Sequence, residues 1–432
     1  MKKIISLIIV CTIIISGMFI YGKSDKKDLL EDNNGPIIAA VIDGKASTTF
    51  PTTNKYTATV ECTRNGIKQD VDAKAIWNGT KWVVSFNDIS AGNVRCNAIF
   101  TTRFPTFSET ILANNEVKAP ITTPGVAIST ASEALLASAE DDYGTSYYFR
   151  GAVTNNYVEF ANKCWRIVRV GGDGSVKLIL HNDNTVGAAN PCDAANNSAS
   201  AAFARYSGTT YESTFNTNYN DNAYVGFKYG TVGSSTYEAT HANTNNSTIL
   251  TNLETWYTNN LKDYADTIAD NVWCNDKTNV TDITYNPWNM SNVNGLGYGT
   301  NKIYYGATQR LISTSNSAGG TGPSLKCNGK LSKITSKVGL ITADELAFAG
   351  YGYELQNSTT YLQENATEVL WWSLSPSSFD GSYACVWCVY GSFGRFYNRY
   401  VSNTGAVRPS ISLISSTSIT GDGTSENPYK VV

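Results

Sequence analysis

An apolar segment stands at the start of the chain. It covers residues 4–21, follows Met1-Lys2-Lys3, and contains only four small or hydroxyl-bearing interruptions. A run of about 18 apolar residues is just long enough to cross the bilayer core as a helix. No small-x-small cleavage pattern follows, since Ile20-Tyr21-Gly22 is a poor cleavage site. Residues 1–33 are therefore predicted to form a membrane anchor and a short stalk. An atypical signal peptide is the alternative, and either one exports the rest of the chain.

Residues 34–103 show the period-two alternation of β-strands. In 56–62 and in 94–100, apolar and polar side chains alternate, so each segment has one inward face. Between them lies Asn78-Gly79 with apolar flanks, the strongest short-range signal for a hairpin. Cys62 and Cys96 fall on the inward faces. We predict a small all-β immunoglobulin-like sandwich whose two sheets are joined by a Cys62–Cys96 disulfide.

The rest of the chain reads as a linker and one large domain. Residues 104–141 are rich in Thr, Ser, Ala and Pro with little periodicity, which predicts a linker. Residues 142–415 begin and end with strand patterns. In between they hold two helices, starting after Ser247 and at the Thr342 capping box, and two long polar loops. Residues 416–432 are a polar tail. The predicted fold class is α+β, with a membrane helix and a small sandwich in front of the large domain.

Composition narrows the range of functions. Charged residues make up 16% of the chain and the net charge is -3, which argues against a nucleic-acid binder. Both histidines, His181 and His241, lie in polar stretches and are predicted to be exposed, so no metal site or histidine triad is expected. Asp344 and Glu345 are explained by the charge preference of a helix N-terminus, with an acid/base pair as the alternative. The protein is therefore predicted not to be an enzyme and to need no cofactor.

Export makes the cysteines candidates for disulfides. Cys11 lies in the apolar segment, which leaves eight. Within the large domain the preferred pairs are Cys274–Cys327 and Cys164–Cys192, while other pairings stay open. Cys385-x-x-Cys388 has the spacing of a redox pair, but on a strand, residues three apart face opposite sides. Separate disulfides or free thiols are therefore expected there.

Five sequence blocks of the large domain follow one another in a fixed order. They are Tyr147-Tyr148-Phe149-Arg150-Gly151, Cys164–Val170, Val338–Glu345, Trp371–Pro376 and Gly405-Ala406-Val407-Arg408-Pro409. In this order the blocks resemble exported bacterial proteins that carry a C-type-lectin-like domain of the formylglycine-generating-enzyme type. The resemblance spans about residues 145–415 and implies an α+β domain with paired terminal strands and a ligand site on its long loops. Most members are binders, and the reactive cysteines of the enzymes cannot be mapped onto Cys385 and Cys388. The calcium-dependent sugar signatures Glu-Pro-Asn and Trp-Asn-Asp are missing.

In some proteins of that type, a diversity-generating retroelement mutates the segment before the last strand. Residues 377–403 are rich in the residue types that adenine-directed mutation produces, among them Asn, Tyr, Ser, Phe and Arg. The resemblance therefore implies a variable ligand-binding segment. An Asn- and Tyr-rich composition from an AT-rich genome explains the same pattern equally well.

The strand pattern in this segment predicts a binding face. Alternation places Ala384, Val386 and Cys388 toward the core and the odd-numbered residues on a ligand surface. Tyr, Trp and Arg are the residue types that dominate binding energies. The alternative is that Trp387 is a core residue. The predicted ligand-binding residues are Tyr383, Cys385, Trp387, Phe393, Arg395, Tyr397 and Arg399.

The predicted function is a cell-surface adhesin or receptor that binds an extracellular protein or glycan through this face. The chain would be held in the cytoplasmic membrane by its N-terminal segment, or secreted. An exported thiol enzyme using Cys385 and Cys388 and a non-binding structural wall protein are the alternatives.

Overall fold

The computed structural model describes residues 37–431, except for 88–93, 207–210, 328 and 330. It divides into two compact units, Met1–Pro105 and Thr106–Val432, each of which is described by itself. The predicted membrane anchor, residues 1–33, lies outside the described residues. Across the part of the chain that is described, none of the helices is both long and apolar enough to cross a bilayer.

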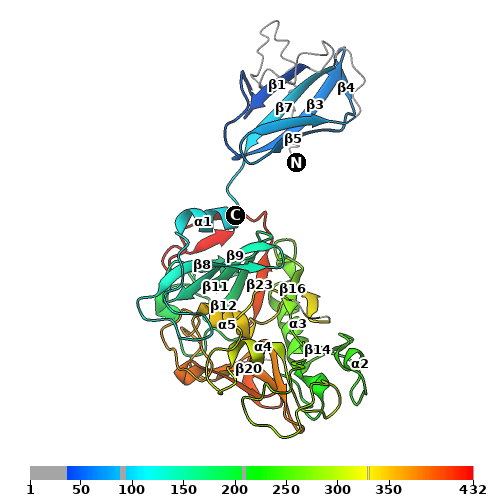
Figure 1. Ribbon diagram of the computed structural model, residues 1–432. Helices are drawn as coiled ribbons and strands as arrows, with labels where there is room; N and C mark the ends of the chain where they lie inside the picture. Colours follow the sequence, from blue (N-terminus) through cyan, green and yellow to red (C-terminus); the bar gives the residue numbers. More distant parts are fainter. Residues whose placement is uncertain (1–36, 88–93, 207–210, 328, 330, 432) are drawn as a thin grey trace, which may run out of the picture. The chain divides into compact units, whose positions relative to one another are not determined.

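The first unit is built on a five-stranded sheet with the order β2-β1-β7-β3-β4 (Figure 1). β3 and β4 are joined at Asn65-Gly66, where both residues have positive φ (48° and 81°), as a tight hairpin turn requires. The predicted Asn78-Gly79 hairpin is present between β5 and β6, and its Trp77 and Trp82 pack with Phe100 of the sheet. The strands are β1 (Ile37–Ile42), β2 (Lys45–Ser47), β3 (Tyr56–Arg64), β4 (Ile67–Gln69), β5 (Ala73–Trp77), β6 (Trp82–Phe86) and β7 (Val94–Thr102).

The Cys62–Cys96 disulfide is present, but the prediction that it joins two sheets is wrong. Cys62 and Cys96 are direct register partners on the neighbouring strands β3 and β7, with Cα atoms 4.0 Å apart. The disulfide therefore links two neighbouring strands within one sheet. Because the second layer is only the two-stranded β5–β6 hairpin, the structure does not show the predicted immunoglobulin-like sandwich.

The second unit contains two larger sheets. The first has the order β23-β12-β11-β10-β25-β24, with β9 pairing both β11 and β8. The second has the order β13-β22-β19-β20-β21, with β17 pairing β19. The strands of the first sheet are β8 (Ala134–Asp141), β9 (Gly144–Gly151), β10 (Tyr157–Phe160), β11 (Lys163–Val170), β12 (Val176–Asn182), β23 (Ser410–Leu413), β24 (Ile419–Thr420) and β25 (Tyr429–Val431). Those of the second are β13 (Glu212–Thr214), β17 (Ile303–Tyr304), β19 (Leu370–Phe379), β20 (Ala384–Tyr390), β21 (Arg395–Tyr400) and β22 (Thr404–Ala406).

Helices are few and short. The predicted caps are confirmed: Ser247 caps α3, and Thr342 forms a capping box at the start of α5. α5 ends at Gly350, whose φ of 125° other residues rarely adopt. Smaller elements are β14 (Lys228–Tyr229), β15 (Asn245–Asn246), β16 (Asn271–Cys274) and β18 (Lys333–Ser336). The helices are α1 (Phe107–Asn114), α2 (Tyr237–His241), α3 (Thr248–Asn260), α4 (Gly306–Leu311) and α5 (Ala343–Ala349).

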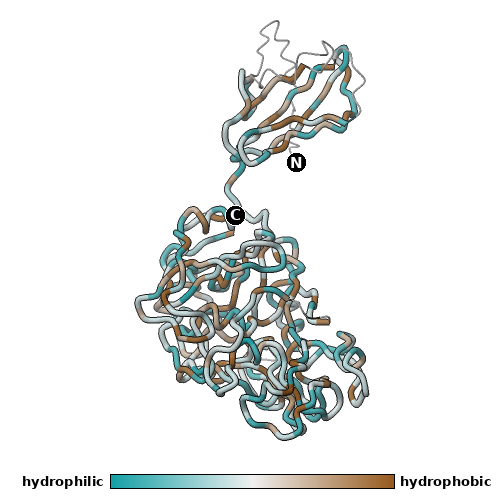
Figure 2. Tube along the Cα trace, in the orientation of Figure 1, coloured by the Kyte–Doolittle hydropathy of each residue, from teal (hydrophilic) through white to brown (hydrophobic). Residues whose placement is uncertain are grey.

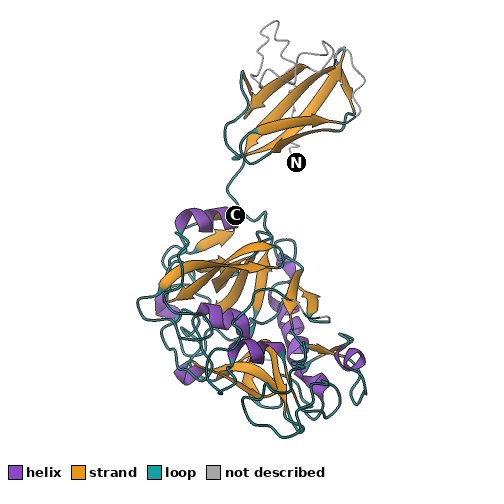
Figure 3. Cartoon of the chain, viewed as in Figure 1, coloured by secondary structure: helices purple, strands orange, loops and turns teal. Residues whose placement is uncertain are grey.

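The α+β prediction is therefore wrong, because the described part of the chain is only 14% helical and mostly sheet (Figure 3). The two helices predicted from apolar patterns, α3 and α5, are present. The long loops around them contain only short helices of one or two turns. α4 and α5 contact each other, and both contact β19, while α5 also contacts β9 (Figure 1). The largest hydrophobic cluster of the second unit includes buried residues of both sheets and of α3, α4 and α5. Hydrophobic stretches accordingly lie along these strands and helices (Figure 2).

The predicted linker, 104–141, is instead part of the second unit from Thr106 onward. It holds α1, which begins with a Thr106–Glu109 capping box, and β8, which pairs with β9 along its whole length. The predicted polar tail also contributes to this sheet, because β25 pairs with β10 and Tyr429 packs on Phe107 at 5.4 Å. Both ends of the unit are thus held by the same sheet.

Candidate functional site

The predicted binding ribbon forms, but its two strands do not present the predicted set of side chains together. Across the β20–β21 pair, Trp387 is the register partner of Asn398, whereas Cys388 is the partner of Tyr397. Partners share a face of a sheet and neighbours alternate, so Trp387 lies on the face opposite to Tyr397. Trp387 is fully buried against Phe396 at 4.6 Å between ring centroids. Trp387 and Cys385 are therefore buried and not presented on the predicted ligand surface, and Trp387 is a core residue, as in the alternative interpretation.

Four of the remaining predicted residues lie in or beside the edge strand β21, and they range from half-buried to exposed. Arg395, Tyr397 and Arg399 are the partners of Tyr390, Cys388 and Val386, so all three lie on one face. Phe393, in the turn before β21, is 59% exposed. We call Tyr390, Arg395, Tyr397 and Arg399 on this face, together with Phe393 of the adjoining turn, the Arg–Tyr surface.

Cation–aromatic contacts hold the Arg–Tyr surface in place. The Arg395 guanidinium lies 5.1 Å from the Tyr397 ring, and that of Arg399 lies 5.1 Å from the Tyr390 ring. Arg395 also forms a half-exposed ion pair with Glu354 at 3.2 Å. Within the described part of the chain, Arg399 has no carboxylate within salt-bridge distance. The Arg399 guanidinium therefore lies over an aromatic ring, and its charge is available to a binding partner.

Tyr383 belongs to a separate stack of three tyrosine rings. The ring of Tyr383 lies between those of Tyr219 and Tyr400, at centroid distances of 5.0 and 4.3 Å. Tyr219 lies in a loop far from this ribbon in the sequence, and the sequence pattern did not predict that the two would be in contact. The stack leaves Tyr219 and Tyr400 each about 40% exposed.

Cys385 and Cys388 are free and buried. Burial raises the pKa of the Cys385 thiol to about 12, and burial also raises that of Cys388 above its ordinary value. Nucleophilic and redox cysteines need the opposite, an accessible thiol with a lowered pKa. The geometry therefore argues against the thiol-enzyme alternative. The disulfides Cys164–Cys192 and Cys274–Cys327 are present, as predicted.

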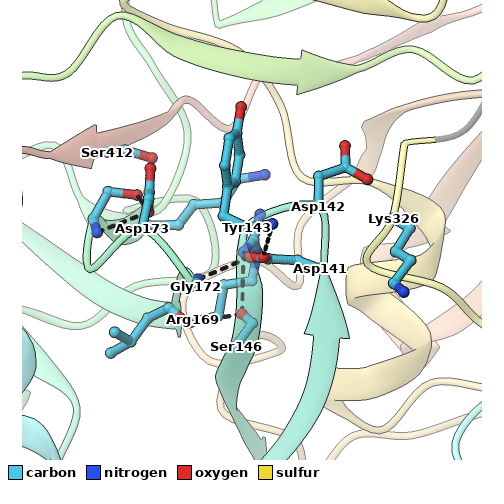
Figure 4. Close-up of polar contacts among 12 residues, drawn as sticks. Asp141, Asp142, Tyr143, Ser146, Arg169, Gly172, Asp173, Lys326 and Ser412 are labelled. Carbon is cyan, nitrogen blue, oxygen red and sulfur yellow. Dashed lines mark hydrogen bonds and ion pairs between the residues drawn. The ribbon is translucent and has the colours of Figure 1, made fainter.

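A charged pocket that the sequence did not predict lies at the first sheet of the second unit, beside β8, β11 and β12. Figure 4 shows part of its lining. Its free volume is about 50 Å³, room for very small molecules only. Arg169 of β11 donates to Asp141 at 2.8 Å and to Glu345 of α5 at 3.0 Å. Asp141 in turn accepts from the backbone of Gly172 and Tyr143, which orders the loop at the mouth. Tyr143, Asp142, Asp173 and Lys326 also line the pocket, and Figure 4 shows them near Asp141 and Arg169.

Two further cations line the pocket, the buried Lys177 and the partly buried Arg310. Lys177 reaches both Glu345 oxygens at 2.7 Å, and Arg310 holds Asp344 through two bonds of 2.7 and 2.8 Å. Arg310 also donates to Asp276 at 2.7 Å. Burial opposes the charge of Glu345, but Lys177 and Arg169 outweigh it and lower the pKa of this carboxyl to about 2.

Asp344 and Glu345 are therefore tied up in ion pairs and do not act as an acid/base pair. In the sequence, Asp344 and Glu345 were recognisable only through the capping box, which marks the start of a helix. The capping box gives no information about the cations from β11, β12 and α4 that contact this helix start. Among the described residues, no group of three or more His, Cys, Asp or Glu side chains could hold a metal ion.

The prediction of exposed histidines is wrong, because His181 and His241 are both fully buried. Burial, with Arg166 and Arg408 nearby, lowers the pKa of His181 well below its ordinary value. Burial and then Lys277 lower the pKa of His241 to about 3. Both rings are therefore neutral. His181 lies on β12 and His241 ends α2, and sheet pairing and helix packing, not local polarity, decided their burial.

Comparisons with known proteins find no match: no family model, no curated protein and no solved structure matches this chain.

Proposed function

We propose that this chain is an extracellular ligand-binding protein that uses the Arg–Tyr surface of β21 to hold a protein or glycan partner. The observation that carries the proposal is the row of Arg395, Tyr397 and Arg399 on one face of an edge strand. It is joined by the 59% exposed Phe393. Aromatic and Arg side chains are the usual anchors of binding interfaces.

The scaffold beneath this surface supports the proposal. β20 is buried almost throughout, and Trp387 and Phe396 pack on the reverse face of the ribbon. An anchor that is already held in place loses little conformational entropy on binding, as in antibody paratopes. Because Arg399 has no carboxylate partner in the described part of the chain, we expect the partner to bring an acidic group to this position.

The extracellular setting rests on three disulfides, Cys62–Cys96, Cys164–Cys192 and Cys274–Cys327. Such bridges persist in oxidising compartments and are rare in the cytosol. The resemblance to exported binders is consistent with this setting but remains a prediction from sequence blocks. The predicted variable segment, 377–403, includes both the buried strand β20 and the exposed Arg–Tyr surface, so variation would be tolerated mainly at the exposed positions.

The test is a binding screen of the full chain on glycan and extracellular-protein arrays, followed by titration of each hit with variants. We expect Phe393→Ala and Arg399→Ala each to weaken binding by about tenfold or more. Matched controls are Tyr143→Ala, an aromatic residue that is 57% exposed in the turn between β8 and β9, and Arg95→Ala on β7 of the first unit. If both surface variants bind as the wild type does, the Arg–Tyr surface is not the site.

A further inference from the structure

The three disulfides of the described chain differ in how well solvent reaches them. In two of them, each cysteine is at most 2% exposed and packs in a hydrophobic cluster. These two are the Cys62–Cys96 and Cys164–Cys192 bridges. In the third bridge, Cys327 is 7% exposed and Cys274 is partly exposed. Both of its cysteines line the charged pocket, so this bridge is the most accessible of the three.

The third bridge holds one wall of the charged pocket. This wall is formed by residues 324–327, which we call the wall segment. Cys327 at its end is joined to Cys274, the last residue of β16. Backbone amides of the wall segment also donate to two carboxylates, at 2.9 Å to Asp344 and at 3.3 Å to Asp142. Reduction of the disulfide would remove the covalent tether and leave the wall segment to these hydrogen bonds.

Two lysines stand beside the same bridge. Lys326 precedes Cys327 in the chain and lines the pocket, and Lys333 is the register partner of Cys274. The Lys333 side chain is 49% exposed and pairs with Asp142 at 2.8 Å. Neighbouring cations lower the pKa of a cysteine thiol, and a thiol of lower pKa leaves faster in thiol–disulfide exchange. Access and local charge therefore both favour attack at this bridge.

From these observations we infer that Cys274–Cys327 is a thiol-responsive switch, which a low-molecular-weight thiol opens while the other two bridges stay closed. The thiolate of the reagent attacks one sulfur of the bridge, forms a mixed disulfide with that cysteine, and releases the other cysteine as a thiolate. A second reagent thiolate then attacks the mixed disulfide. Both cysteines end as thiols with the two protons of the reagent, and two reagent molecules end as one disulfide.

Opening this bridge acts on the pocket and leaves the core in place. Within the described chain, neither Cys274 nor Cys327 belongs to a hydrophobic cluster. The buried residues of both sheets therefore keep their packing when the bridge is reduced. The reduced second unit should stay folded, with a wall segment that opens to solvent more often.

The experiment treats the full chain with 2-mercaptoethanol in native buffer, traps free thiols with an alkylating reagent, and identifies the labelled cysteines by mass spectrometry. Cys274 and Cys327 should be labelled at least about tenfold faster than the cysteines of the other two bridges, which serve as internal controls. Lys326→Gln removes the cation beside Cys327 and should slow this labelling. Lys262→Gln, at an exposed lysine that does not line the pocket, should not slow it.

Hydrogen exchange then measures the wall segment itself. After reduction, the backbone amides of residues 324–327 should exchange at least about tenfold faster, while those of β20 keep their protection. A Cys274→Ser, Cys327→Ser double variant should show the fast exchange without any thiol and no further response to it. Reduction of another bridge first, or of all three together, would overturn the inference. Selective reduction with unchanged exchange in the wall segment would also overturn it, because the bridge would then control nothing in the pocket.

Discussion

Trp387 and Tyr397 lie on opposite faces of the β20–β21 ribbon, because Trp387 pairs with Asn398 while Tyr397 pairs with Cys388. Because the two residues lie on opposite faces of the ribbon, one contributes to the core and the other to the candidate binding surface. Trp387 belongs to the core of the second unit, and Tyr397 belongs to the Arg–Tyr surface. Stability and binding should therefore respond to different substitutions in the same ribbon.

Replacement of Trp387 should reduce stability. Trp387→Ala removes a fully buried ring and leaves a cavity, so we expect the free energy of unfolding to fall by about 3–5 kcal/mol. Phe393→Ala, at a 59% exposed position in the same ribbon, should change it by less than about 0.5 kcal/mol. Urea titration of both variants measures the difference. Equal effects would mean that Trp387 is not part of the core.

The thiols of Cys385 and Cys388 should be unreactive in the folded protein. Both are buried, and burial raises the pKa of each above its ordinary value, so little thiolate is present at neutral pH. In a Cys11→Ser background, a thiol reagent should label neither until denaturant is added, and both afterwards. Rapid labelling of the native protein would contradict this and revive the thiol-enzyme alternative.

Acid should weaken the charged pocket. The pKa of Glu345 is about 2 in the folded protein, against an ordinary value of 4.5, so its contribution is fully present above pH 4.5 and is lost as the pH falls toward 2. Glu345→Gln should lower stability at neutral pH by about 3 kcal/mol, because Lys177 and Arg169 lose their shared partner.

The same variant should also show a shallower fall in unfolding free energy between pH 4.5 and pH 2. Glu354→Gln makes the same chemical change at a half-exposed ion pair and should cost less than about 1 kcal/mol. Denaturant titrations across the pH range compare the two. A parallel pH dependence of Glu345→Gln and wild type would show that Glu345 is not the group responsible.

Loss of the Cys274–Cys327 bridge should destabilise the second unit. The bridge closes a loop with a sequence separation of 53, for which chain entropy predicts about 4 kcal/mol. A Cys274→Ser, Cys327→Ser double variant should therefore unfold at lower urea concentration. Cys385→Ser, which breaks no disulfide, serves as the cysteine control. An unchanged urea midpoint in the double variant would indicate that these two cysteines are not bridged.

Local patterns predicted the features that depend on neighbours in the chain. The α3 and α5 caps, the Asn78-Gly79 hairpin and three disulfide pairs all follow from short-range signals or from cysteine placement. The amount of sheet was underestimated, because short strands such as β22 and β25 are specified by partners far away in the sequence. The same holds for the segment 106–141, whose β8 is a strand because β9 lies beside it.

The sequence by itself determined the apolar start of the chain, the helix caps, the tight turns and a supply of exposed-type aromatic and Arg residues near the C-terminus. Only the tertiary structure decided which of them share a surface. Strand register placed Trp387 and Tyr397 on opposite faces, and long-range packing buried His181 and His241. Two strands and helix α4, all distant from α5 in the sequence, brought Arg169, Lys177 and Arg310 to the acidic start of α5. The physical reason is that strand alternation fixes two faces, while the pairing of strands and the closing of the core determine which face meets water.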